Sequence, residues 1–285
     1  MPATGPSDRA RLVEFAQRSK GPDVRPGYDP AMSPEMLADR CALLRRLHVK
    51  GTPLVLPNAW DAGSARAVVK AGFPVVATTS GGVALALGFE DHEGAPRDEM
   101  AAAAARIVNA VEVPVTVDFE AGYGLEPAAV VEQLQRIGVA GCNLEDTDHR
   151  SGQLRPVTEQ AQWLAAIRAA ADGAGYGLVI NARIDVFLMD RSRPQSEGLD
   201  AALERSKAYA AAGVDCVYPI FMIDADTRRA FVSGSPGPVN VLAWPGAEDA
   251  SALGADGVAR ISYGSRLHTQ SMRHLVDDLA AIRGA

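Results

Sequence analysis

Eight short apolar segments, each followed by a segment with helical periodicity, constrain the fold of this chain more than any other feature. The predicted strands are rich in β-branched or apolar residues and cover 54–58, 75–79, 115–119, 140–145, 178–183, 216–220, 239–243 and 257–262. The helical patterns cover 63–71, 97–111, 127–137, 158–171, 199–212, 224–232, 247–253 and 267–282. A further helix is predicted from Ser33, which can cap it, with Pro34 in the first helical position. Repeated strand–helix units predict parallel strands joined by right-handed crossovers.

The length of the chain helps to choose between two architectures. Its 285 residues are close to the roughly 250 residues typical of one (β/α)8 barrel. Units of this kind build either a closed barrel or an open, Rossmann-like sheet, but no GxGxxG segment follows the first predicted strand, where 58–61 reads NAWD. We therefore predict an α/β fold of the (β/α)8 TIM-barrel type, with one barrel domain over 33–285 and an N-terminal arm over 1–32.

Composition narrows the class of partner. A net charge of −7 argues against nucleic acid, because duplex binding depends on clustered Lys and Arg. The three cysteines are widely spaced without a CxxC pair, which indicates neither a disulfide framework nor a zinc cluster and fits a reducing cytoplasm. No uninterrupted apolar run reaches the roughly 18 residues of a membrane span, and the N-terminus lacks an apolar signal segment. We expect an unprocessed cytoplasmic protein that binds a cation or a small anion, with no nucleic acid and no membrane as partner.

Acidic and polar side chains gather where the predicted strands end, which is where barrel enzymes carry their active sites. Residues two apart in a strand face the same side, so if one member of such a set points into the barrel mouth, the others do too. The residues concerned are Asp118 and Glu120, Asn143 and Glu145, and Asn181, Arg183 and Asp185. Three neighbouring strands would then bring at least three carboxylates and an arginine into one small volume.

Such a concentration of negative charge requires compensation. Carboxylates about 6 Å apart repel by roughly 3 kcal/mol per pair at an effective dielectric constant near 20. A bound cation would supply the compensation, and oxygen ligands without His or Cys at ligand spacing favour Mg²⁺ or Mn²⁺ over zinc. The alternative is that Glu120, Glu145 or Asp146 caps a helix or joins a solvated salt-bridge network.

Two further features complement a metal. Ser80, Gly81 and Gly82 follow the second predicted strand, and successive N–H groups in such a turn suit a carboxylate, although a Gly-Gly pair is also common in plain turns. Arg183 would clamp a second anionic group or stabilise charge that develops in the reaction. A metal, an N–H pocket and an arginine together describe a site for a small, doubly anionic 2-oxo acid whose enolate the metal stabilises.

In these segments the chain resembles the isocitrate lyase and phosphoenolpyruvate mutase superfamily. The resemblance spans about 57–264 and rests on PNAWD, TTSGG, the loop acid Asp91, VDFEAGYG, NLED and NARID, in that order. It implies a (β/α)8 barrel, a homotetramer whose last helix is swapped between subunits, and a Mg²⁺-bound 2-oxo acid or its enolate as substrate or product.

The same resemblance implies roles for individual residues. Asp118 would bind the metal directly, and the metal's waters would be held by Asp91, Glu120 and Glu145. The substrate would be bound by Ser80, Gly81, Gly82 and Arg183, and we expect Trp60 to line the same pocket.

One segment departs from the family. Its lyases carry a KRCGH-type segment on the loop after the fourth strand, with a cysteine as the acid or base, whereas 146–155 here reads DTDHRSGQLR. Cys142 alternates with Asn143 and Glu145 and should face the helices. This argues against an isocitrate or methylisocitrate lyase. His149 is the candidate proton carrier in the loop, with a surface histidine as the plain alternative and His92 as a second candidate.

The sequence therefore favours a Mg²⁺-dependent lyase that cleaves a C–C bond next to a 2-oxo acid carbonyl, as in decarboxylation of an oxaloacetate-like acid. We expect Arg183, Glu145 and His149 to be the catalytic residues. Two alternatives remain open: C–P chemistry on phosphonopyruvate, against which the absence of Lys and Asn from the loop counts, and a barrel that binds a metal or metabolite without catalysis.

Overall fold

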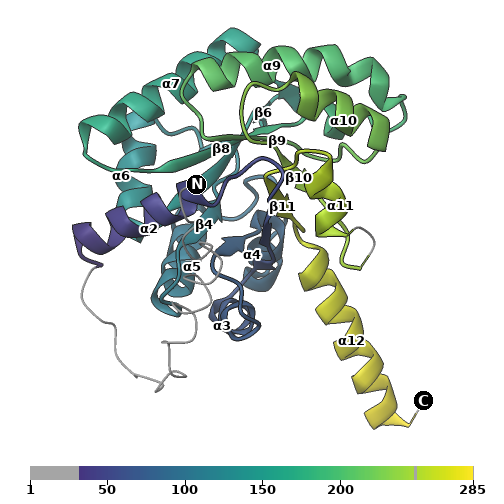
Figure 1. Cartoon of the computed structure of the whole chain (residues 1–285). Coiled ribbons are helices and arrows are strands. Elements are labelled where there is room, and N and C mark those ends of the chain that lie inside the picture. The colour runs from purple at the N-terminus through teal and green to yellow at the C-terminus, as the bar shows by residue number, and fades with distance from the viewer. Residues whose placement is uncertain (1–31, 247–248, 285) are drawn as a thin grey trace, which may run out of the picture.

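The computed structural model describes residues 32–246 and 249–284 (Figure 1). The fold is mixed α/β, with parallel strands at the centre and helices around them. Apart from Met32, the arm predicted over 1–32 lies outside the described residues and stays a prediction. Among the described residues, no helix combines the length and apolar character that crossing a membrane requires.

The parallel strands form two sheets. The six-stranded sheet has the order β2 (Asn58–Ala59), β3 (Val76–Thr78), β4 (Val115–Asp118), β5 (Gly141–Glu145), β8 (Val179–Ile184) and β9 (Cys216–Pro219). The three-stranded sheet has the order β1 (Leu54–Leu56), β11 (Arg260–Ser262) and β10 (Asn240–Leu242). All eight predicted strand segments are present, and the first is divided into β1 and β2 at Pro57, which has no N–H to donate. A parallel bridge between Val217 and Val239 joins β9 to the start of β10.

The predicted helices are all present. They are α2 (Pro34–Arg46), α3 (Ala62–Lys70), α5 (Arg97–Asn109), α6 (Pro127–Ile137), α7 (Val157–Gly173), α9 (Leu199–Ala211), α10 (Ala225–Gly234), α11 (Ala250–Ala255) and α12 (Arg266–Arg283). As expected, Ser33 caps α2, since its side chain accepts a hydrogen bond from the Met36 N–H at 3.2 Å. Five elements were not predicted: α4 (Ser80–Leu87), α8 (Val186–Met189), the 3₁₀ turn η1 (Gln195–Gly198), and the antiparallel strands β6 (Thr147–Asp148) and β7 (Gln153–Leu154).

A buried polar layer lies among the central strands, below their carboxyl ends. Asn143 of β5 is paired in register with Asn181 of β8 and accepts a hydrogen bond from it at 2.8 Å. The guanidinium of Arg260, which is 1 % exposed, donates to the same Asn143 oxygen at 3.2 Å. Asn143 and Asn181 therefore project to the same side of the sheet, which fixes the direction in which Glu145 and Arg183, two residues further along, also project.

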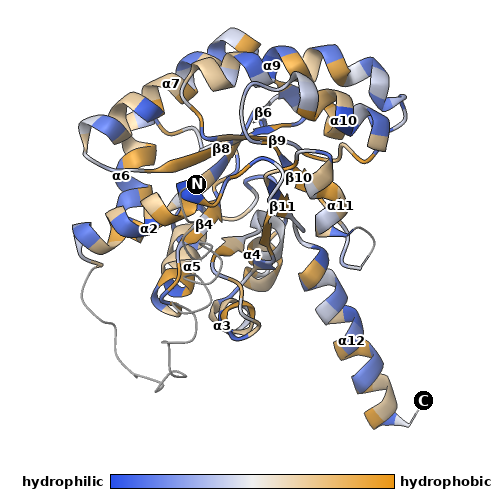
Figure 2. Ribbon diagram, viewed as in Figure 1, coloured by the Kyte–Doolittle hydropathy of each residue, from blue (hydrophilic) through white to orange (hydrophobic). Residues whose placement is uncertain are grey.

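The C-terminal helix α12 extends away from the rest of the described chain (Figure 1). Hydrophobic and hydrophilic residues are interspersed along it (Figure 2). Its exposed apolar side chains are Met272, Leu275, Val276, Leu279 and Ile282. Apolar side chains brought together on one exposed helix are typical of a surface that packs against another protein chain.

Asp215, just before β9, joins several elements at the opposite end of the strands. Its carboxylate accepts hydrogen bonds from Arg45 of α2 at 2.7 Å, from Arg168 of α7 at 2.6 Å and from the Ile180 N–H of β8 at 2.8 Å. The side chain is only 14 % exposed. A single carboxylate thus holds two helices against the sheet.

We expect Asp215→Ala to lower the free energy of unfolding by about 2–4 kcal/mol, because two arginines and a strand N–H lose their acceptor. Chemical denaturation followed by circular dichroism measures the change. The matched control is Glu197→Ala, which removes the exposed partner of Arg193 and should change the free energy by less than about 1 kcal/mol. Equal losses in the two variants would contradict the role given to Asp215.

Candidate active site

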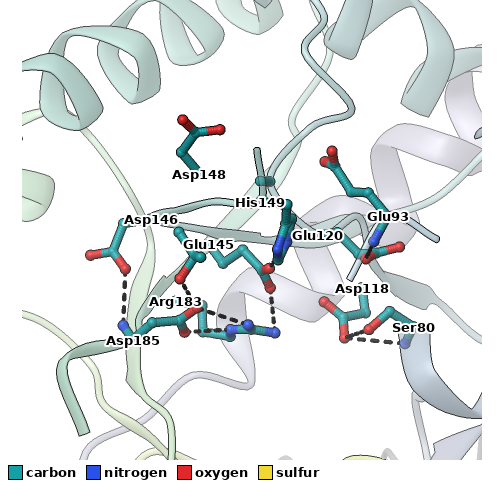
Figure 3. A network of polar contacts seen from close by, with 12 residues as sticks. Ser80, Glu93, Asp118, Glu120, Glu145, Asp146, Asp148, His149, Arg183 and Asp185 are labelled. Atoms are coloured by element: carbon teal, nitrogen blue, oxygen red, sulfur yellow. Dashed lines mark hydrogen bonds and ion pairs between the residues drawn. The ribbon is translucent and has the colours of Figure 1, made fainter. Parts of the chain in front are cut away.

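Six of the predicted site residues lie together at the carboxyl ends of β3, β4, β5 and β8 (Figure 3): Ser80, Asp118, Glu120, Glu145, His149 and Arg183. The strand register places Asp118 beside Asn143, and Glu145 beside Arg183. Ser80 follows β3 directly and lies against Asp118. Residues that are far apart in the sequence therefore meet because neighbouring parallel strands end at the same edge.

Asp118 has one carboxylate oxygen fixed by the protein and one that is not. Its Oδ2 accepts hydrogen bonds from the Ser80 N–H at 3.2 Å and the Ser80 hydroxyl at 2.9 Å. Its Oδ1 is buried and has no hydrogen-bond partner among the described residues. Burial raises the pKa of Asp118, the charge of Arg183 opposes this, and the charge of Asp91 adds to it. An unpartnered carboxylate oxygen in such a place calls for a ligand.

The segment 80–82 differs from its expected local structure. It was predicted as a turn with an open pocket of N–H groups, but it forms the first turn of α4. The N–H and hydroxyl of Ser80 are both engaged by Asp118. The two glycines allow close approach instead: a Cβ on Gly81 would lie 2.7 Å from the Asp91 carboxylate, and one on Gly82 would lie 3.2 Å from the Cβ of Trp60. The predicted contact of Ser80, Gly81 and Gly82 with substrate stays a prediction.

Glu120 and Glu93 lock two loops together beside Asp118. Glu120 accepts hydrogen bonds from the hydroxyl of Tyr123 and from the backbone N–H of Glu93. Glu93 in turn accepts one from the Tyr123 N–H at 2.6 Å. Burial raises the pKa of Glu120 to about 7, although both of its hydrogen bonds act in the other direction. Glu120 is therefore held by protein groups through both of its carboxylate oxygens.

Arg183 is fixed from two sides. Its Nε and Nη2 donate to the two oxygens of Asp185, at 2.6 and 2.9 Å, and its Nη1 forms an ion pair with Glu145. Burial opposes the charged form of Arg183, but Asp185 and Glu145 carry its pKa well above the ordinary value. Burial likewise raises the pKa of Glu145 well above its ordinary value, against the effect of Arg183.

Further hydrogen bonds hold Asp185, the partner of Arg183, in place. Asp185 accepts a hydrogen bond from Thr147 at 2.6 Å, and its N–H donates to Asp146 at 2.9 Å. Asp146 also accepts from Arg205 at 2.9 Å and from the hydroxyl of Tyr209 at 2.8 Å. For Asp146, the alternative of a salt-bridge network is thus the observed one, although the network is buried rather than solvated.

His149 contacts this network directly. Its Nε2 lies 2.5 Å from a Glu145 oxygen, and its side chain is 11 % exposed. The alternative of a freely exposed surface histidine is therefore wrong. His92 lies close by, with its ring centroid 5.5 Å from that of His149. Trp60 is half-buried and packs edge-on against His268, with 5.2 Å between the two ring centroids. Its place as a pocket residue stays a prediction.

The acids do not form a cluster of direct metal ligands. Among the described residues, no three His, Cys, Asp or Glu side chains are arranged to hold a metal ion. The reason is that Glu145 is paired with Arg183 and Glu120 with Tyr123, so protein groups already compensate part of the charge. The free Oδ1 of Asp118 nevertheless fits a hard cation. Mg²⁺ keeps several of its waters in proteins, so one direct carboxylate with others reached through water is an ordinary arrangement for it.

Sequence reasoning missed some of the supporting residues. Glu93 was not among the predicted site residues, and Arg205 and Tyr209 were predicted only as part of the helix over 199–212. The spacing of Arg205 and Tyr209, four apart, shows that they share a helix face, but nothing in the sequence shows that this face meets Asp146. Asp185 was expected on the same strand face as Arg183, but it lies just after β8 at the N-cap of α8, and its role as the anchor of Arg183 was not predicted.

The family model for phosphoenolpyruvate phosphomutase matches residues 44–283. The chain belongs to this family. The putative phosphonomutase from Burkholderia cenocepacia J2315, a crystal structure, is 44 % identical, with a TM-score of 0.80 over 85 % of this chain and 99 % of the other. A 2-methylisocitrate lyase from Bacillus subtilis is 32 % identical over 216 residues, which is 73 % of this chain and 67 % of the relative.

A third relative carries no named activity. It is an uncharacterised protein from Mycobacterium tuberculosis, 34 % identical over 219 residues, which is 77 % of this chain and 80 % of the relative. Matches to a mutase family and to a lyase together confirm the resemblance inferred from the motifs. The chain is an enzyme of the isocitrate lyase and phosphoenolpyruvate mutase superfamily.

The three cysteines, Cys41, Cys142 and Cys216, are free and buried, and burial raises the pKa of each to about 12. We expect the folded protein to resist thiol-directed reagents at pH 8, because a thiol in this state forms almost no thiolate. Absorbance assays should detect the three thiols only after denaturation. Rapid modification of one thiol with loss of activity would contradict this and would return Cys142 to consideration as a catalytic group.

Proposed function

We propose that this enzyme is a Mg²⁺-dependent carbon–carbon lyase that acts on a small 2-oxo diacid, with Mn²⁺ as a possible substitute for Mg²⁺. One observation carries the proposal. A buried Asp118 oxygen without a hydrogen-bond partner among the described residues lies at the same edge of the sheet as Arg183, which Asp185 holds in place. The first suits a hard cation and the second suits an anionic substrate. The lyase activity named for the Bacillus subtilis relative supports the reaction class.

We propose further that the two parallel sheets form one (β/α)8 barrel. Only Pro57 separates β1 from β2, and the bridge from Val217 to Val239 links the other ends of the two sheets. A closed ring of strands would place every site residue at one rim, in the position where barrel enzymes carry their chemistry.

In this proposal Asp118 binds the metal directly, and Asp91, Glu120 and Glu145 hold its waters. Ser80 keeps the Asp118 carboxylate in place through two hydrogen bonds. When bound, the ion would polarise the 2-oxo group and lower the energy of the enolate that bond cleavage leaves. Asp185 presents Arg183 in one orientation before substrate arrives, so little ordering remains for the binding step.

Glu145 and His149 supply the proton-handling groups of the proposed site. They are in contact at 2.5 Å, and Glu145 also pairs with Arg183, so the proton carrier lies beside the anion-binding group. Decarboxylation requires a proton at the carbon that loses CO₂, and an imidazole is suited to deliver it near neutral pH. The segment in which relatives carry a catalytic cysteine forms the β6–β7 hairpin here and has no thiol. This favours decarboxylation over cleavage of a methylisocitrate-like substrate.

C–P chemistry is a second candidate, because a relative at 44 % identity is described as a putative phosphonomutase. The same arginine and the same metal position suit a phosphonate as well as a carboxylate. Residues 146–155 contain neither Lys nor Asn, and this counts against C–P chemistry. Asn143 lies on the preceding strand, outside this segment.

We also propose a homo-oligomer, a tetramer by analogy with the family, in which α12 packs on a neighbouring subunit. The exposed apolar residues of α12 support this. Light scattering should give a mass several times the 29.9 kDa of one chain, and a monomer at micromolar concentration would contradict it.

The reaction is tested with a panel of oxaloacetate-like 2-oxo diacids, assayed for pyruvate and CO₂ with Mg²⁺ or Mn²⁺. We expect turnover that EDTA abolishes, and a loss of about 10²–10³-fold in kcat/KM for Asp118→Asn. The control is Asp98→Asn, whose side chain is 81 % exposed and which should leave activity unchanged. Phosphorus NMR on phosphonopyruvate separates C–P chemistry. Inactivity on the whole panel and on phosphonopyruvate, with Mg²⁺ and oxalate still bound, would point to a non-catalytic protein.

Asp185 is a positioning residue in this proposal, since it acts through Arg183. We expect Asp185→Asn to raise KM more than it lowers kcat, with a total loss of about 10–100-fold in kcat/KM, because the guanidinium loses its charged, two-point partner. Asp172→Asn on α7, whose side chain is 66 % exposed, is the control for removing one acid. A fall in kcat alone, with KM unchanged, would contradict a role in anchoring the substrate-binding arginine.

A further inference from the structure

Two further arginines, Arg191 and Arg266, lie at the same edge of the sheets and have no role in the proposed active site. The guanidinium carbon of Arg191 lies 3.8 Å from the ring centroid of Phe221. That of Arg266 lies 3.7 Å from the centroid of Trp244 and 5.7 Å from that of Phe221. These residues follow β8, β9, β10 and β11, so four neighbouring strand ends contribute to one cluster. We call it the Arg191–Arg266 cluster.

The positive charge of this cluster is not balanced by the described part of the chain. No described carboxylate forms an ion pair with Arg191 or Arg266. Within the described chain, the guanidinium of Arg266 makes one hydrogen bond, a long one of 3.4 Å to the Tyr263 carbonyl. Burial lowers the pKa of Arg266, Tyr218 opposes this, and the positive charge of Arg191 lowers it further. Two guanidiniums that repel each other are thus held together by the faces of aromatic rings.

Stacking leaves most of the hydrogen-bonding capacity of these arginines free. A guanidinium that lies flat on a ring uses its face, while its N–H groups point outward in the plane. Those N–H groups match the oxygens of a carboxylate or a phosphonate. An oxyanion bound there would also remove the repulsion between the two arginines.

The backbone at Phe221 points to the same conclusion. Among the described residues, five other than glycine have a positive φ, and four of them, His92, Glu93, Glu120 and Tyr123, belong to the loops around Asp118. The fifth is Phe221, with φ of 61°. A left-handed conformation is strained in a bulky residue, and such strain clusters at functional sites. Here it places the ring beneath two guanidiniums.

Tyr218 connects the cluster to the proposed active site. It is buried in β9, in register with Arg183 of β8. The charges of Arg183, Asp118 and Arg266 all act on its hydroxyl. Tyr218 therefore lies on the strand between β8, which carries Arg183, and β10 and β11, whose ends lead to Trp244 and Arg266.

We propose that the Arg191–Arg266 cluster is a second anion-binding subsite, which receives the distal anionic group of the substrate. The inference rests on the proposed function and sharpens it: the substrate is a 2-oxo acid whose far end carries a carboxylate or a phosphonate. The 2-oxo acid end binds at Asp118 and Arg183, and the chain of the substrate passes Tyr218. Acids that lack the distal group bind only the first part of the site.

The test compares unreactive ligands by calorimetry in the presence of Mg²⁺. Oxalate probes the Asp118 and Arg183 part alone, while 2-oxopentanoate and 2-oxoglutarate have the same carbon chain but differ in a distal carboxylate. We expect wild type to bind 2-oxoglutarate at least about 10-fold more tightly than 2-oxopentanoate, since a guanidinium–carboxylate contact is worth about 1.5–3 kcal/mol. A 2-oxo acid ending in a phosphonate, compared with 2-oxoglutarate, shows which of the two oxyanions the cluster prefers.

Variants assign the preference to the cluster. Arg266→Gln should abolish the preference for the diacid and leave oxalate affinity unchanged, and Arg266→Lys should restore only part of it, because lysine keeps the charge but loses the planar fork. The control is Arg193→Gln, which removes one positive charge from the same loop as Arg191 but from a side chain paired with Glu197. It should keep the full preference. Thermal unfolding of each variant checks that the fold is retained.

The outcomes separate this inference from the proposed function. If oxalate binds but wild type shows no preference for the diacid, or if Arg193→Gln removes the preference as Arg266→Gln does, the subsite is overturned and the proposed function stands. A preference that depends on Arg266 in a protein without turnover supports the subsite and counts against the lyase. If neither oxalate nor the diacid binds, both proposals fail.

Discussion

The ion pair and hydrogen bonds between Arg183, Asp185 and Glu145 determine the geometry of the site. They lie almost entirely out of contact with water, where an unpaired charge is very costly and a fully paired network is stable only with good geometry. The two-point contact from Asp185 supplies that geometry for the arginine. Glu145 pairs with the other side of the Arg183 guanidinium and is itself in contact with His149. The strands that carry these residues are adjacent and in register, so any shift between β5 and β8 would break the network.

The other end of the site depends on a different balance. Asp118 receives two hydrogen bonds from Ser80 on one oxygen and none from the described residues on the other. The protein thus satisfies the carboxylate only in part and leaves the rest to a ligand. Glu120 is closer to full satisfaction through Tyr123 and Glu93. This difference between neighbouring acids supports the proposed assignment of direct metal binding to Asp118.

Much of the fold and part of the site could be predicted from the sequence. Apolar segments and helical periodicity gave every main strand and helix, because burial of strand residues leaves a strong local pattern. The two-residue spacing correctly put Asn143 and Glu145 on one face. Short elements are not predicted by these patterns: the first residues of α4, Ser80 to Gly82, are poor helix formers, and their sequence favours a turn. The partners of Asp146 and Arg183 escaped prediction because they depend on how elements pack in space, which no local pattern records.

The exposed apolar side of α12 has a consequence for how the protein behaves on dilution. This helix is 18 residues long, and within the described part of the chain most of its apolar side chains are exposed, with Ile282 83 % exposed near its end. If a second chain covers them, part of the folding free energy is paid between molecules and grows with the logarithm of their concentration. The melting temperature would then rise with protein concentration, and dilution alone would make the native state less stable.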